Sequence, residues 1–288
     1  MARKNIFELL ISKYDIVKEM NKIVQIFEQT KLGYGFSYFE KQQQTYSIEQ
    51  VFEWNCFPDW KQRGPYISCA EMKADLNLPK KYSQDMGDML KGLEYYVNIL
   101  SNLKYKINIP GNINVSCPPL YAMLLTNIDI LLEHINYEKL EFPEEEKVIL
   151  VPKNPAATAV AEIAPKEIAF AILKYNHASL KGQLEEKRQL LVSIANEYEP
   201  LLEKPVEGFK DYFAKTTGLL NNLNIRHNNT AGKNKNEIVA KMSPEELESW
   251  YDELYQLLLF CVLCKDNYER KGRVSELLKN LKTELKAK

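Results

Sequence analysis

The apolar residues of this chain recur at intervals of three and four, and this spacing constrains the fold more than any other feature. The pattern is clear over Phe7–Phe27, Met86–Leu103 and Leu120–Ile135, and it fills almost every window after Pro155. An apolar residue at every third or fourth position forms one face of an α-helix. The sequence therefore predicts a mainly α fold built as a helical bundle.

A change of period predicts one small β element in the N-terminal half. Apolar and polar residues alternate over Tyr105–Ile109 and again over Ile113–Val115, on either side of the turn-forming residues Pro110–Asn112. This alternation is typical of a β-hairpin. A brief apolar stretch over Val148–Val151 also has the composition of a strand.

The segment Glu141–Pro155 predicts a domain boundary. It contains an acidic run and closely spaced prolines, and proline cannot continue a helix or donate a backbone hydrogen bond. We therefore expect an N-terminal helical region over residues 1–150, to which the sequence assigns no role, and a helical bundle over residues 156–288.

Composition excludes several classes of protein. The 288 residues are 45% hydrophobic and carry a net charge of -1, so a core can form and no overall field favours nucleic acid or a membrane. No apolar stretch approaches the roughly 20 residues of a membrane span, and no signal-peptide pattern is visible. The five cysteines are an odd number, which favours reduced thiols. We expect a cytoplasmic protein that does not bind a membrane.

Motifs for metals and cofactors are weak. Cys261 and Cys264 have the spacing of a metal or redox pair, but a zinc site needs four ligands, and both cysteines lie on an apolar helical face where they can pack as small hydrophobes. Gly232-Lys233 lacks the other residues of a phosphate-binding loop. We expect no metal and no small-molecule cofactor.

One metal-dependent alternative stays open. Asp59, preceded by proline, and the triplet Glu71-Met72-Lys73 fit the pattern of a restriction-type nuclease core. In such a core two carboxylates hold a divalent metal and the lysine lies near the attacked phosphate. This alternative requires Asp59 and Glu71 on adjacent strands of a sheet.

The strongest functional signal lies in the polar segment Asn221–Gly232. It reads Asn-Asn-Leu-Asn-Ile-Arg-His-Asn-Asn-Thr-Ala-Gly and lies between an amphipathic helix and a second helix with start signals at Ser243-Pro244. This arrangement resembles the motif of the HEPN superfamily, helical bundles that include many ribonucleases of toxin, abortive-infection and phage-defence systems. The resemblance covers residues 160–288.

In this resemblance Arg226 matches the family's arginine, His227 its second polar position and Gly232 its glycine, whereas Ala231 stands where the family has histidine. Metal-independent RNA cleavage needs a base for the 2′-hydroxyl proton and a cation for the phosphate. Arginine supplies the charge but cannot act as the base. The catalytic motif is therefore impaired, and His227 is the candidate base.

The resemblance also implies an RNA partner and a homodimer in which two motifs meet. Asn222, Asn228 and Asn229 would then bind RNA through hydrogen bonds, and Lys233 and Lys235 would raise the local positive potential. The leading hypothesis is thus an RNA endonuclease or RNA-binding regulator of an abortive-infection type system.

The second hypothesis is a non-catalytic helical interaction or scaffold protein. It predicts a long apolar seam used for self-association. Arg226 and its neighbours would then only order the loop by capping helix ends.

Overall fold

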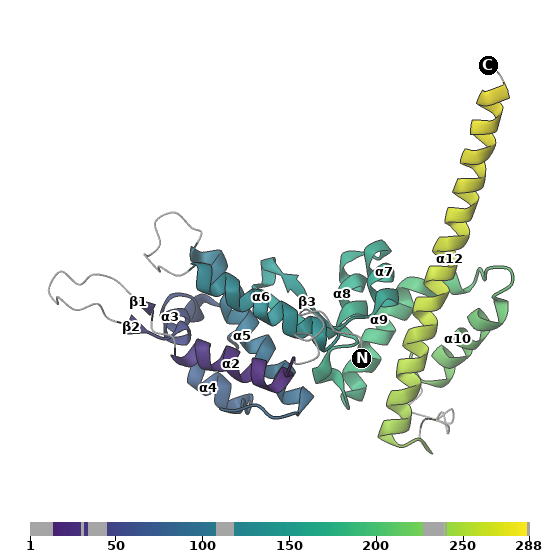
Figure 1. Cartoon of the computed structure of the whole chain (residues 1–288). Helices are drawn as coiled ribbons and strands as arrows, with labels where there is room; N and C mark the ends of the chain where they lie inside the picture. Colours follow the sequence, from purple (N-terminus) through teal and green to yellow (C-terminus); the bar gives the residue numbers. More distant parts are fainter. Residues whose placement is uncertain are drawn as a thin grey trace, which may run out of the picture. The chain divides into compact units, whose positions relative to one another are not determined.

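The computed structural model describes residues 14–29, 32–33, 45–107, 118–226, 239 and 241–286 (Figure 1). The chain divides into two compact units, Met1–Lys153 and Asn154–Lys288, called unit 1 and unit 2. Each unit has its own hydrophobic core. The described chain is mainly helical, which confirms the predicted fold class.

Unit 1 combines helices with two short antiparallel pairs of strands. Its elements are α2 (Ile16–Gln29), β1 (Leu32–Gly33), β2 (Thr45–Tyr46), α3 (Ile48–Asn55), the 3-10 helix η1 (Phe57–Asp59), α4 (Cys69–Asp75), α5 (Met86–Ile107), α6 (Pro118–His134), β3 (Tyr137–Phe142), the 3-10 helix η2 (Pro143–Glu145) and β4 (Lys147–Pro152). Apolar residues from α2, α3, α5 and α6 form the core, with Phe27, Phe52 and Leu93 fully buried.

The regular elements in the described part of unit 2 are all helices. Its elements are α7 (Pro155–Ile163), α8 (Lys166–Lys174), the 3-10 helix η3 (Ala178–Leu180), α9 (Leu184–Leu202), α10 (Lys210–Asn222) and α12 (Pro244–Lys286). Tyr175, Phe213 and Tyr255 are among the largest side chains in its core. Among the described residues, no helix has an apolar stretch long enough to span a membrane.

The β-hairpin of unit 1 does not lie at the predicted residues. Tyr105–Ile107 form the last turn of α5, so the strand expected to start there is wrong, and residues 108–117 lie outside the described part. Leu100, Leu103 and Ile107 are spaced three and four apart, which continues the helical pattern. The hairpin is instead β3 paired with β4, in which Tyr137 lies opposite Pro152 and Phe142 opposite Lys147.

Side chains of α5 bind the backbone of β4 in place of a third strand. Asn98 Nδ2 donates to Val148 O at 2.7 Å, and Val148 N donates to Asn98 Oδ1 at 2.8 Å. One turn earlier, Glu94 Oε2 accepts from Leu150 N at 2.8 Å. Four residues of helix rise about 6 Å and two residues of strand about 6.6 Å, so this spacing lets successive turns of α5 reach alternate residues of β4.

The longest described element of unit 2 is α12, which begins at a serine cap where Ser243 Oγ accepts from Glu246 N at 3.1 Å. Its first half packs against α7, α9 and α10. No described residue of α12 beyond Val262 is buried, although the helix continues to Lys286 (Figure 1). The basic segment at the end of the chain belongs to the same helix, because Gly272 is tolerated inside a helix.

Candidate functional site

The bend that carries Arg226 directly follows α10. Asn224 has a φ of 56°, the left-handed conformation that often ends a helix. Ile225 N donates to Leu220 O at 3.2 Å, and Arg226 N donates to the same carbonyl at 3.3 Å. Ile225 is buried, so the bend is held against the core of unit 2 up to the residue that precedes Arg226.

The guanidinium of Arg226 is bound by side chains of its own unit. Nη2 lies 2.7 Å from Glu199 Oε1 of α9, and Nη1 donates to Asn221 Oδ1 at 3.5 Å. The side chain is 17% exposed, and within the described residues its buried Nε has no hydrogen-bond partner. A carboxylate therefore occupies the position beside the guanidinium that the RNA hypothesis assigns to a phosphate.

Of the remaining residues of the predicted RNA site, the structure describes Asn222 alone. Asn222 lies in the last turn of α10, where its Nδ2 donates to Gly218 O at 2.8 Å. His227, Asn228, Asn229, Ala231, Gly232, Lys233 and Lys235 lie outside the described residues. The structure thus gives the surroundings of Arg226 and Asn222 in the motif.

No protein-family model, curated protein or solved structure matches this chain. The resemblance to the HEPN superfamily therefore stays a prediction from the residues around Arg226. The interpretation of the site depends on the chain's own geometry.

A polar cluster in unit 2 centres on Lys187, whose side chain is only 9% exposed. Its Nζ lies 2.7 Å from Asp252 Oδ1 and 2.9 Å from Glu248 Oε1. Tyr175 OH donates to the same Asp252 oxygen at 2.9 Å. The cluster joins α9 and α12 to the residue that follows α8.

The carboxylate of Glu248 is further held by a backbone turn. Gly182 N donates to its two oxygens at 2.9 and 3.1 Å, and the φ of 77° at Gly182 is one that glycine adopts readily. Burial would raise the pKa of Glu248, but the hydrogen bonds and charge of Lys187 and the Gly182 amide hold that pKa below its ordinary value. All these groups satisfy one another, so we interpret the cluster as structural.

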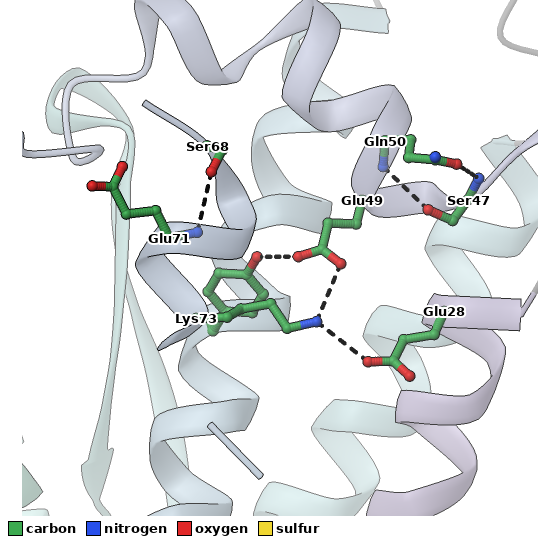
Figure 2. Close-up of polar contacts among 8 residues, drawn as sticks. Glu28, Ser47, Glu49, Gln50, Ser68, Glu71 and Lys73 are labelled. Carbon is green, nitrogen blue, oxygen red and sulfur yellow. Dashed lines mark hydrogen bonds and ion pairs between the residues drawn. The ribbon is translucent and has the colours of Figure 1, made fainter. Parts of the chain in front are cut away.

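A second polar cluster, in unit 1, centres on Lys73 of α4. Its Nζ lies 3.3 Å from Glu28 of α2 and 3.2 Å from Glu49 of α3. Figure 2 shows the Lys73 side chain between these two carboxylates. Tyr95 OH of α5 donates to Glu49 at 2.6 Å. Burial, followed by the Glu49 carboxylate, raises the pKa of the nearby Cys69 thiol to about 12. The thiol is therefore not an activated nucleophile, and the cluster's role is to connect four helices.

The same region does not form the core that a metal-dependent nuclease requires. Asp59 lies in η1, while Glu71 and Lys73 lie in α4, so the expected placement on adjacent strands is wrong. Ser68 Oγ accepts from Glu71 N at 3.1 Å, a hydrogen bond drawn in Figure 2. Glu71 Oε2 in turn accepts from Ile67 N at 2.8 Å. The acidic residue thus helps to start a helix. Nor does the described part of the chain gather three or more His, Cys, Asp or Glu side chains that could hold a metal.

A cavity of about 210 Å³ lies between α5, α6 and β3 of unit 1. An ion pair between Lys139 Nζ and Asp129 Oδ1, 2.7 Å apart, lines it together with Thr126. Its volume is below the roughly 300 Å³ at which ligand pockets begin. We therefore assign no ligand to it.

Most of the exposed large apolar side chains in the described part of unit 2 lie on α12. Four side chains of the second half, 46% to 58% exposed, form the α12 stripe: Val274, Leu277, Leu278 and Leu281. Three rings 36% to 46% exposed form the aromatic patch: Phe209, Tyr212 and Phe260. In this patch the Tyr212 and Phe260 ring centroids are 5.0 Å apart, and those of Phe209 and Phe260 5.7 Å apart.

The α12 stripe is not among the features singled out from the sequence above. The signal is present, because Val274, Leu277, Leu278 and Leu281 follow the spacing of helical docking anchors, i, i+3, i+4 and i+7. The aromatic patch has no such signal, since Phe209 and Phe260 are far apart in sequence and meet only through the packing of α10 on α12.

Proposed function

We propose that this chain is a non-catalytic helical interaction protein whose binding surface is the exposed face of α12. The observation that carries the proposal is the α12 stripe, in which four large apolar side chains lie on a helical segment where none of the residues of described burial is buried. Large apolar side chains gathered on one exposed face are typical of protein interaction sites.

Energetics support a bound state for this segment. A helical segment without tertiary packing is marginally stable in water, and α12 continues as a helix well past Val262. Removing one half-exposed leucine from water gains roughly 1 kcal/mol. The four residues of the stripe together therefore offer a partner a few kcal/mol of favourable burial.

The RNA-directed function is less well supported by the geometry of Arg226. Its guanidinium is paired with Glu199 and largely buried. Binding a phosphate there would require separating this pair, which leaves the carboxylate of Glu199 without its cation. Ala231 cannot supply the base that the family's histidine provides.

We expect total RNA to stay intact when it is incubated with the purified protein, because Glu199 holds Arg226 and the motif lacks its histidine. The Arg226→Ala and His227→Ala variants should leave the same RNA profile, measured by sequencing of RNA ends. Cleavage by the wild type that both variants lose would establish the RNA-directed function instead.

A photo-cross-linking amino acid tests the interaction surface in cells. Placed at Leu278, it should yield protein adducts that survive ribonuclease treatment, because this position lies within the stripe. The matched control is Glu276, an exposed residue of the same segment that lies on the far side of the helix from the stripe at about 100° per residue. Equal adducts at both positions, or adducts that disappear with ribonuclease, would contradict a protein-binding stripe.

A further inference from the structure

Charge is segregated along α12. The first half, residues 244–264, contains five acidic residues and no Lys or Arg, whereas residues 265–286 contain seven basic and four acidic residues. Two of the acidic residues, Glu248 and Asp252, bind Lys187. Glu253 is exposed and has no ion pair among those found in the described chain.

Helical geometry places the features of both halves on one face. Leu278 follows Phe260 by about five turns, or about 27 Å, so the two residues lie on the same side of the helix. Glu253 precedes Phe260 by about two turns and Lys282 follows it by about six, so both lie within about 40° of that side. The exposed face of α12 therefore presents an acidic residue, the aromatic patch, the stripe and a basic residue in order.

We propose that a second copy of this chain covers this face, with the two α12 helices antiparallel. The stripe of each copy then packs on the aromatic patch of the other, and the basic second half of each lies along the acidic first half of the other. This inference rests on the proposed role of α12 and specifies the partner.

The antiparallel arrangement also brings opposite charges together at the edges of the exposed face. When Leu278 of one copy lies opposite Phe260 of the other, Lys282 falls within about one turn of the other copy's Glu253. Lys282 and Glu253 lie on the same flank of the exposed face, and antiparallel helices bring equivalent flanks together. The symmetric pair contains this contact twice.

A parallel pair is disfavoured by the same charges. It would align the five acidic residues of the two first halves and the seven basic residues of the two second halves, and like charges brought together repel. The stripe alone is also shorter than the three or four heptads that support a parallel coiled coil.

The test uses the purified full-length chain and its mass in solution as a function of concentration. We expect a monomer–dimer equilibrium that Glu253→Lys and Lys282→Glu each weaken by about tenfold, because each reversal acts at two contacts. The chain that carries both substitutions should dimerise like the wild type. Phe260→Ser should weaken the dimer, whereas Ile67→Ser, which removes an 83% exposed side chain of unit 1, should not.

Two results would overturn the inference. In a parallel dimer the double substitution would fail to restore association, because the two reversed charges would lie at opposite ends of the paired helices and would not meet. A chain that stays monomeric at every concentration would exclude the second copy. If Leu278 then still yields protein adducts in cells, the proposed function stands with another partner; if those adducts are also missing, both proposals fail.

Discussion

The Lys187→Ala variant is expected to lose about 3 kcal/mol of the free energy of unfolding of unit 2, because removing one partner of a buried ion pair leaves the other charge uncompensated. Glu248 and Asp252 would both lose the ammonium that lies within 3 Å of them. Asp252 is half exposed, which lets water offset part of the loss. Hydrogen exchange of α9 and α12 peptides across a urea titration measures the effect separately from unit 1.

Lys215 provides the matched control for this prediction. Its Nζ lies 2.7 Å from Asp211 Oδ2, but both side chains are at least 65% exposed. Exposed pairs of this kind contribute roughly 0.5 kcal/mol or less. Equal destabilisation by Lys187→Ala and Lys215→Ala would mean that the buried cluster does not support unit 2.

The second large effect is expected in unit 1. Asn98→Ala should reduce the free energy of unfolding by about 3 kcal/mol, because the amide and carbonyl of Val148 would both be left buried without their partner. Each of these groups bonds Asn98 at less than 3 Å. Urea denaturation followed through hydrogen exchange of the β3–β4 peptides measures the loss.

Asn102, one turn further along α5, gives a graded comparison. Its Nδ2 reaches the hairpin through one long hydrogen bond, 3.4 Å to Glu146 O. Asn102→Ala should therefore cost less than half as much as Asn98→Ala. A loss at Asn102 as large as that at Asn98 would show that the two close contacts to Val148 do not determine the stability of the hairpin.

The helices could be predicted because their signals are local. The apolar spacings over Met86–Leu103 and Leu120–Ile135 predict two helices, and the structure contains both as α5 and α6. The strand composition of Val148–Val151 predicts β4, which the structure contains. Its partner β3, and with it the hairpin, was missed because no residue of β3 is buried. The hairpin depends on α5, in which Glu94, Asn98 and Asn102 are spaced four residues apart and therefore lie on the same face of the helix. Polar residues that recur four apart among the apolar residues of Leu93–Leu103 are the signal that points to such a role.

The candidate site was harder to predict because its contacts are distant in sequence. The polar bend at Arg226 follows α10, as the spacing of Asn221–Gly232 after an amphipathic helix predicts. Glu199, its ion-pair partner, lies on another helix, and no local pattern connects the two residues. In the sequence, Lys187 has the pattern of an ordinary charged residue on an amphipathic helix. Its ion pair with Asp252 forms only because α12 packs against α9 in the folded unit.

The side chains of α5 that bind β4 also affect the tendency of this chain to aggregate while it folds. An unpaired strand edge is a template for strands of other molecules, and proteins that leave one open risk aggregation. In unit 1 the amides of Val148 and Leu150 are occupied by Asn98 and Glu94, so the mature hairpin offers little of this edge to a neighbour. Before α5 docks, the edge is free, and variants that weaken this docking should precipitate during refolding sooner than their loss of stability alone would suggest.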